Sequence, residues 1–301
     1  MSPNLKLARI AVCTLILAIG TNSPGIPADK QPSQKDIVYA KVDAIELKVD
    51  LYLPDAPQPR PRLIVWVHGG AWRGGSKNDV PIVDLLDSGF AIASVDYRLS
   101  PMAKFPAQIH DIKAAIRFLR ARQDKFRYDA SRIAIAGSSA GGHLAALVGV
   151  SGGNAELEGK VGEHLGQSST VQAIVSFYGM SNLTTILDQS TPHGLKVRVP
   201  ALELLLGGQP SDKQDLARLA SPVFHVDAND PPLLLLHGDQ DPQAPINQSH
   251  ELQGRYEAAQ APCRLVVILG GKNGGAEFYD GQRISLVREF LHPTEKPHPP
   301  R

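Results

Sequence analysis

Short apolar runs separated by helix-length segments constrain the fold of this chain more than any other feature. These runs lie at 62–67, 90–95, 133–136, 171–177, 233–236 and 264–269. Each suits a strand that is buried on both faces of a sheet, and the segments between them can hold crossover helices. Strands that alternate with helices predict an α/β fold with a mostly parallel central sheet covered by helices on both faces.

Three other segments complete this organisation. Residues 38–53 alternate apolar and polar side chains, which predicts a hairpin of half-buried strands. Residues 107–122 repeat apolar side chains at helical spacing, which predicts an amphipathic crossover helix. The insertion at 181–232 lacks a strand pattern, and 202–206 predicts only a short helix within it. Such an insertion is typical of a lid over a pocket, with a solvated excursion as the alternative.

The two ends of the chain predict segments outside the folded domain. Lys6 and Arg9 precede an apolar run at 10–19, which is typical of a secretory signal peptide over 1–20. A membrane-spanning helix needs about 20 apolar residues, so an uncleaved anchor or a buried helix is the weaker interpretation. We therefore expect a secreted or periplasmic protein with no stable membrane anchor. After the signal peptide, the sequence predicts a linker over 21–36, a domain over 37–291 and a disordered, Pro-rich tail over 292–301.

Charge and cysteine content limit the partners. The 31 basic and 30 acidic side chains form no long run of either sign, so we expect no nucleic acid partner and no binding to anionic membranes. The expected partner is a small or neutral molecule, and the oligomeric state stays open. Only Cys263 would remain after removal of the signal peptide, which excludes an internal disulfide and favours a structural thiol.

The strongest local signal is Gly-Ser-Ser-Ala-Gly at 137–141. It directly follows the apolar run at 133–136 and leads into a helix-like segment, and strand, tight turn and helix form the context of a nucleophile elbow. The flanking glycines allow a strained turn that pushes the hydroxyl of Ser139 out of the sheet, and the helix N-terminus favours developing negative charge. Ser139 is therefore the predicted nucleophile.

Two more motifs follow predicted strands. His-Gly-Gly-Ala-Trp at 68–72 is where this kind of site holds an oxyanion with backbone N–H groups, so Gly70, Ala71 and Ala140 are the candidate donors. A simple turn is the alternative for the paired glycines. His-Gly-Asp-Gln-Asp at 237–241 supplies a carboxylate after the serine in chain order. Asp241 is the predicted orienting acid and Asp239 the second choice, although each could cap the turn.

Together these motifs resemble those of α/β-hydrolases in the acetyl-esterase and feruloyl-esterase-like (BD-FAE-like) group, with more distant similarity to hormone-sensitive-lipase-type esterases. The resemblance covers about residues 37–291 and rests on motifs at 68–72, 96–101, 137–143, 221–222 and 237–241. It implies an α/β-hydrolase fold, with the lid-like insertion. It also implies cleavage of carboxylic esters through an acyl-enzyme on Ser139, oriented by Asp241, without a metal or a cofactor. Short acyl esters, including those linked to carbohydrates, are the expected substrates.

One position departs from the pattern of this group. The catalytic histidine is expected in the Gly-rich loop after the last strand, but residues 270–275 read Gly-Gly-Lys-Asn-Gly-Gly, and Asn273 stands at its position. An amide can neither take the serine proton nor return it to the leaving group. By analogy with other triads, loss of the base costs on the order of 10⁶ in kcat.

Two explanations for Asn273 stay open. The chain is an esterase that has lost its base, or it is a non-catalytic binding module that holds a carbonyl or carboxylate ligand on the same fold. A substitute base would have to come from another histidine, and the candidates are His68, His143, His193, His225 and His292. Dienelactone hydrolase and prolyl peptidase relatives are weaker alternatives, because the first use a Cys nucleophile and the second carry a large extra domain.

Overall fold

The computed structural model describes residues 30–55 and 59–292 of the 301-residue chain. The predicted signal peptide over 1–20 lies outside the described residues, as does the tail apart from His292. Strand β1 (Gln34–Val42) begins inside the segment 21–36 that the sequence assigns to a linker. It does so because Gln34 already pairs with the neighbouring strand, and the N–H of Asp36 donates to the buried Asp50 carboxylate at 2.7 Å.

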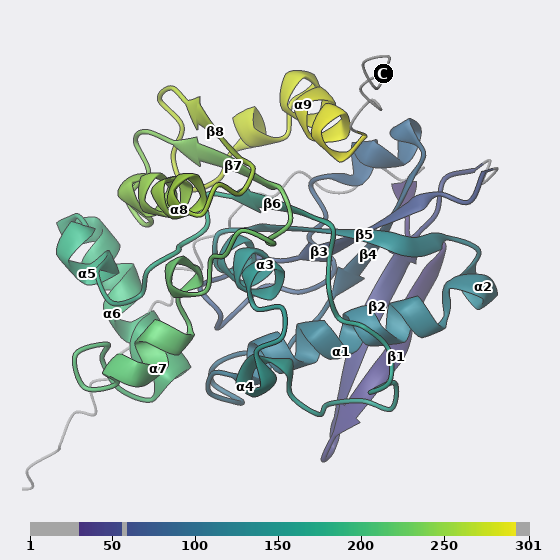
Figure 1. Cartoon of the computed structure of the whole chain (residues 1–301), viewed down its shortest axis with the longest axis horizontal. Helices are drawn as coiled ribbons and strands as arrows, with labels where there is room; N and C mark the ends of the chain where they lie inside the picture. Colours follow the sequence, from purple (N-terminus) through teal and green to yellow (C-terminus); the bar gives the residue numbers. More distant parts are fainter. Residues whose placement is uncertain (1–29, 56–58, 293–301) are drawn as a thin grey trace, which may run out of the picture.

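An eight-stranded sheet in the order β1-β2-β4-β3-β5-β6-β7-β8 forms the centre of the molecule (Figure 1). Strand β2 pairs antiparallel with β1 and β4, and every other pairing is parallel. This arrangement confirms the predicted α/β-hydrolase fold. The remaining strands are β2 (Ile45–Tyr52), β3 (Arg62–Val67), β4 (Phe90–Val95), β5 (Asp129–Ser138), β6 (Ala173–Phe177), β7 (Leu233–Gly238) and β8 (Cys263–Ile268).

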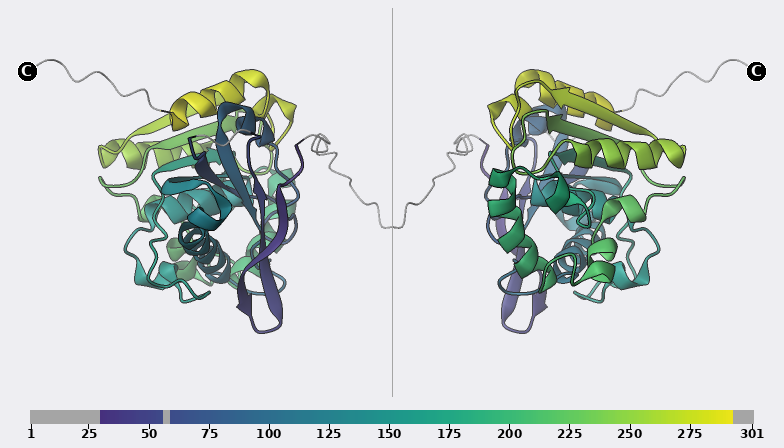
Figure 2. Two further views of the ribbon diagram at one scale, coloured as in Figure 1. Left: turned by 90° about the vertical axis from the view of Figure 1, so that its right-hand side faces the viewer. Right: turned by 90° about the vertical axis from the view of Figure 1, so that its left-hand side faces the viewer.

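Helices cover both faces of the sheet (Figure 2). Alternate residues of β3 divide between two cores, with Val65 in the core that contains α1, α3 and α8, and Trp66 in the core that contains η2 and α9. The helices are η2 (Val83–Ser88), α1 (Ala107–Ala121), α2 (Gln123–Phe126), α3 (Ala140–Val150), α4 (Ala155–Glu158), α5 (Ile186–Gln189), α6 (Pro192–Leu206), α7 (Gln214–Leu219), η3 (Pro222–Phe224), α8 (Asn247–Ala258), η4 (Ala276–Phe278) and α9 (Gly281–Leu291).

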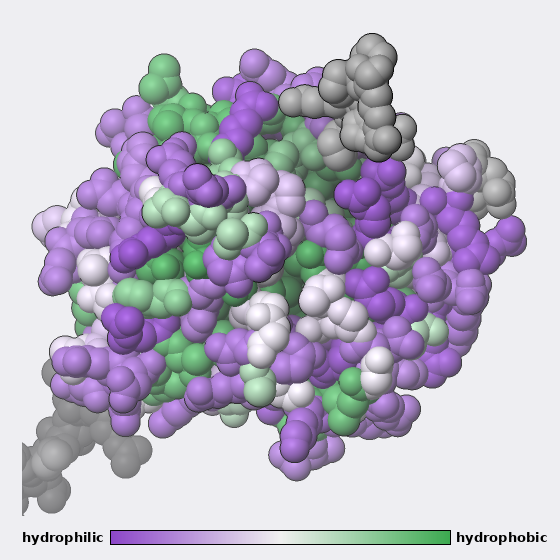
Figure 3. All heavy atoms as spheres, viewed as in Figure 1, coloured by the Kyte–Doolittle hydropathy of each residue, from purple (hydrophilic) through white to green (hydrophobic). Residues whose placement is uncertain are grey.

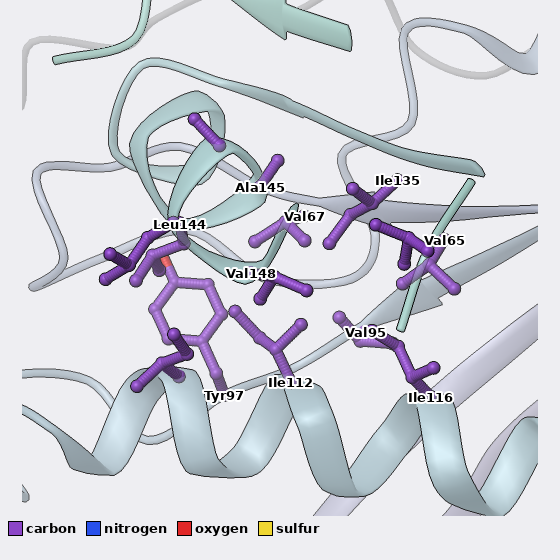
Figure 4. Packing of buried hydrophobic residues seen from close by; sticks show 14 of the residues in the cluster. Val65, Val67, Val95, Tyr97, Ile112, Ile116, Ile135, Leu144, Ala145 and Val148 are labelled. Atoms are coloured by element: carbon purple, nitrogen blue, oxygen red, sulfur yellow. The ribbon is translucent and has the colours of Figure 1, made fainter. Parts of the chain in front are cut away.

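Helix α1 is more deeply buried than an amphipathic helix would be. Its Ile112 and Ile116 face the sheet and α3 in the larger core (Figure 4). The predicted helix is present, but Asp111, Lys113 and Arg117 on its polar side are buried as well. Their charges are paired: Asp111 with Arg98 at 2.7 Å, and both basic side chains with the carboxylate of Glu158. Paired charges can be buried where isolated ones cannot.

The insertion between β6 and β7 contains α5, α6, α7 and η3. Helix α6 is longer than the predicted helix at 202–206, which corrects that prediction. It begins at Pro192 because the side chain of Thr191 accepts the N–H of Gly194 as an N-cap, and it continues past Pro200. The polar first half and the internal proline hid this helix from the hydrophobic pattern.

The outer surface is mixed in character. Hydrophilic residues cover most of the face in Figure 3, and hydrophobic residues lie between them in separate groups. None of the helices within residues 30–55 and 59–292 has the length and apolar character needed to cross a bilayer.

Candidate active site

Ser139 occupies a sharp turn between β5 and α3. Its backbone has φ 50° and ψ −116°, a conformation that residues other than glycine rarely adopt. A Cβ atom on Gly141 would lie 2.0 Å from the carbonyl oxygen of Val67, and one on Gly137 would lie 2.4 Å from the carbonyl oxygen of Gly141. The flanking glycines are therefore required for α3 to pack this closely on the sheet. The Ser139 N–H donates to the Phe177 carbonyl at 2.9 Å, which holds the turn.

The turn after β3 lies beside Ser139. A Cβ atom on Gly69 would be 3.5 Å from the Cβ of Ser139. Gly70 and Ala71 have φ of 107° and 52°, so the backbone turns sharply here. Within the described part of the chain, no acceptor takes the N–H groups of Gly70, Ala71 or Ala140. Unpaired N–H groups next to the predicted nucleophile are available to bind an oxyanion.

Asp241 is held in one orientation by several donors. Its side chain is 0% exposed. Its Oδ1 accepts the N–H groups of Gln243 and Ala244, both at 2.8 Å. Its Oδ2 accepts Nδ2 of Asn273 at 2.6 Å and lies 3.4 Å from Nε2 of His237. The structure thus brings together the predicted acid and the position of the expected base.

Asp239 has a different role from Asp241. Its Oδ1 accepts the N–H of Gly270 at 2.7 Å, at the start of the loop that carries Asn273. The N–H of Gln240 donates to the Gly271 carbonyl at 2.9 Å in the same loop. Asp239 therefore anchors the loop, and it is Asp241 that faces Asn273.

The histidines near the site are engaged elsewhere. Nδ1 of His143 accepts the indole N–H of Trp72 at 3.1 Å, and its Nε2 donates to the Ala220 carbonyl at 2.7 Å. Burial lowers the pKa of His143 to about 4, so its ring is neutral. His68 and His225 each bond to a backbone carbonyl at 2.8 Å. No described residue forms a hydrogen bond with the hydroxyl of Ser139, and no three described His, Cys, Asp or Glu side chains could hold a metal ion.

Two features of the site were missed from the sequence. The hydroxyls of Tyr178 and Tyr279 lie 2.6 Å apart, and a Cβ atom on Gly274 would be 3.6 Å from the first of them, so this pair adjoins the Asn273 loop. Burial raises the pKa of Tyr178 to about 12 and keeps it neutral. Arg198 of α6 is the second feature, and it contacts Gln243 and Trp72. Tyr178 directly follows β6, which is a readable signal, whereas Arg198 lies in a segment without a clear pattern.

Comparisons with known proteins give a consistent family. The BD-FAE family model matches residues 49–256. Esterase LipC of Mycobacterium tuberculosis is 34% identical over 235 residues, which cover 77% of this chain and 56% of LipC. The chain spans about half the length of the curated relatives it matches.

Two solved structures resemble the chain over most of its length. A truncated carbohydrate esterase from gut microbiota has a TM-score of 0.81 and 31% identity, and the match covers 89% of this chain and 97% of that one. Thermogutta terrifontis esterase 2, in a form phosphonylated by sarin, has a TM-score of 0.72 and 26% identity, and the match covers 88% of this chain and 97% of that one. From its motifs, its fold and these similarities, the chain belongs to the BD-FAE family of α/β-hydrolases.

Proposed function

We propose that this chain is a carboxylic ester hydrolase with Ser139 as nucleophile, in which Asn273 occupies the position of the catalytic base. The observation that carries the proposal is the 2.6 Å hydrogen bond from Nδ2 of Asn273 to Oδ2 of Asp241. In a complete triad an imidazole N–H makes this contact with the acid. Membership of a family whose relatives are named esterases supports the reaction class.

The reaction would proceed in two stages. The Oγ of Ser139 attacks the ester carbonyl carbon, and the N–H groups of Gly70, Ala71 and Ala140 stabilise the negative oxygen that forms. Collapse of this intermediate releases the alcohol and leaves the acyl group on Ser139, from which water then releases the acid. Each stage moves a proton that the Asn273 amide cannot accept. We therefore expect turnover on the order of 10⁶-fold below that of a complete triad.

Short acyl esters linked to carbohydrates are the proposed substrates. A carbohydrate esterase is among the similar solved structures and matches 89% of this chain. The predicted signal peptide over 1–20 fits a secreted or periplasmic enzyme, where such esters are accessible.

A non-catalytic binding module is the second candidate function. Two observations on the described residues favour it. No base forms a hydrogen bond with the hydroxyl of Ser139, and no acceptor among them takes the N–H groups of Gly70, Ala71 and Ala140. Such a site could hold a carbonyl or carboxylate group without turning it over. The two functions differ in what happens when the base is restored.

The test is hydrolysis of p-nitrophenyl acetate by the unmodified chain and by Asn273→His, each with and without Ser139→Ala. Asn229→His, at an exposed position outside the site, is the matched control for an added histidine. We expect Asn273→His to raise kcat/KM by roughly 10³-fold or more, and Ser139→Ala to abolish the gain. A folded Asn273→His variant without any gain favours the binding module. Ordinary Ser139-dependent turnover by the unmodified chain would mean that another base acts.

A further inference from the structure

The side chain of Arg198 is a buried cation that the proposed reaction does not use. The residue is 0% exposed. Its Nε donates to the Gln243 carbonyl at 2.8 Å, and its guanidinium carbon lies 5.8 Å from the ring centre of Trp72. Its Nη1 has no hydrogen-bond partner among the described residues. A buried guanidinium with so few partners loses more hydration than these contacts return, so another interaction must offset the cost.

Both segments that Arg198 contacts belong to the candidate site. Gln243 lies in the loop of Asp241 and donates its N–H to Oδ1 of that carboxylate at 2.8 Å. Trp72 directly follows Gly70 and Ala71 and donates its indole N–H to the His143 ring on α3. Arg198 therefore links the insertion to the acid loop and to the oxyanion turn.

The three groups that donate hydrogen bonds to Asp241 carry no charge. Asn273 is an amide, and the backbone N–H groups of Gln243 and Ala244 carry no charge. Nε2 of His237 lies 3.4 Å from Oδ2 of Asp241 and bonds to the Ala244 carbonyl at 2.8 Å, while its Nδ1 bonds to the hydroxyl of Ser249 at 2.6 Å. The Tyr178 hydroxyl nearby is uncharged as well.

Arg198 supplies a positive charge that the three hydrogen-bond donors lack. Burial lowers the pKa of Arg198 to about 10, although the negative charge of Asp241 raises it and the charge of Arg73 lowers it further. Arg198 therefore stays cationic at neutral pH. No direct ion pair joins the two described side chains, but both bond to the backbone of Gln243, Arg198 to its carbonyl and Asp241 to its N–H. Burial of both side chains reduces the screening of their attraction by water.

We propose that Arg198 is a positioning residue, the counter-charge of Asp241, and that it opposes protonation of a histidine placed at position 273. In a complete triad the acid stabilises the imidazolium that forms during the reaction. A fixed cation linked to the acid through Gln243 weakens that stabilisation. A histidine at 273 then stays neutral, and able to accept a proton, down to a lower pH. The first part of the proposal concerns the unmodified chain, and only the second part rests on the proposed function.

A double-mutant cycle in the unmodified chain tests the counter-charge. The melting temperature is measured for the unmodified chain, Arg198→Met, Asp241→Asn and the double variant, with Arg255→Met as a matched surface control. We expect Arg198→Met to lower the Tm strongly in the unmodified chain and much less in the Asp241→Asn background, because the charge that it offsets is then absent. Equal losses in both backgrounds would overturn the counter-charge. If Arg198→Met fails to fold, Arg198→Lys takes its place in the cycle. Because it keeps the charge, it should lower the Tm less than Arg198→Met does.

A pH profile tests the second part. In the Asn273→His enzyme, Arg198→Met is expected to move the midpoint of the acidic limb of kcat/KM upward by about one pH unit, and Arg198→Lys to leave it in place. A residue with a packing role alone would lower kcat/KM at every pH without moving the midpoint, which would overturn this part. If the Asn273→His enzyme has no activity, both the proposed function and the proposed effect of Arg198 on a histidine at position 273 are excluded. The double-mutant cycle of melting temperatures still tests whether Arg198 is the counter-charge of Asp241.

Discussion

Nδ2 of Asn273 donates a hydrogen bond of 2.6 Å to Oδ2 of Asp241. The two residues lie in the loops that follow β8 and β7, which pair in parallel, so the ends of these strands bring them to the same edge of the sheet. The amide satisfies the carboxylate as a hydrogen-bond donor. It therefore holds the carboxylate of the proposed acid in place, while lacking the basic nitrogen that the proposed ester hydrolysis needs.

The two aspartates of the acid loop are expected to differ sharply in the Asn273→His enzyme. Asp241→Asn should lower kcat on the order of 10⁴-fold, because the carboxylate that orients the histidine and stabilises its charge is lost. Asp239→Asn should have a much smaller effect, because Asp239 bonds to the Gly270 N–H and does not face position 273. Steady-state kinetics on p-nitrophenyl acetate measure both, and a reversed order would assign the acid to Asp239.

Asn273→Asp is expected to destabilise the chain in a pH-dependent way. It places a second carboxylate against Asp241, and two carboxylates at this distance raise the pKa of one of them in the folded state. Because the folded-state pKa is raised, the loss of unfolding free energy is absent at low pH, where both carboxyls are protonated. It grows as the pH rises and reaches about 2 kcal/mol at neutral pH.

Urea denaturation of Asn273→Asp and Asn273→Ala at acidic and neutral pH tests this repulsion. The alanine variant loses the same hydrogen bond without adding a charge, so its deficit in unfolding free energy should not depend on pH in this way. Parallel pH dependences for the two variants would exclude carboxylate repulsion.

Local signals explain why much of the site could be predicted from the sequence. The glycines at 137 and 141 mark the turn at Ser139, since only glycine fits where the backbone of α3 meets Val67. The β7 strand is a run of leucines, which places Asp241 just beyond its end. Strand order and spacing then determine the fold, because parallel strands joined by helices have few alternative arrangements.

Long-range contacts explain what the sequence did not reveal. The ring of His143 is engaged by Trp72 and by the Ala220 carbonyl, which lie 71 and 77 residues away along the chain. Arg198 contacts Gln243 across 45 residues, and the buried charges of α1 find their partners in other elements. No periodicity encodes such pairings, so burial of polar side chains was underestimated.

Gly141→Ala is expected to destabilise the fold by roughly 3 kcal/mol or more, because a closely packed backbone cannot absorb an added methyl group without strain. The new Cβ would lie 2.0 Å from the Val67 carbonyl oxygen. Gly152→Ala is the matched control, since its Cβ would meet nothing within 4 Å. Urea denaturation of both variants measures the difference, and similar unfolding free energies would show that α3 can shift away from the sheet.

The buried ring of His143 is expected to make the stability of the chain fall in mild acid. Burial lowers its folded-state pKa to about 4, whereas an unfolded histidine titrates near 6.5. Above about pH 6.5, neither the folded nor the unfolded chain protonates this histidine. Below that pH only the unfolded chain binds the proton, so the free energy of unfolding drops by about 2 kcal/mol between roughly pH 7.5 and pH 5. His143→Gln should be less stable at neutral pH, because the partners of the ring lose their geometry. Its stability should fall less in acid, and part of the remaining fall is due to His68, whose pKa burial also lowers. Unfolding free energies from urea titrations at the two pH values measure this slope, and identical slopes for the variant and the unmodified chain would show that His143 does not titrate in this way.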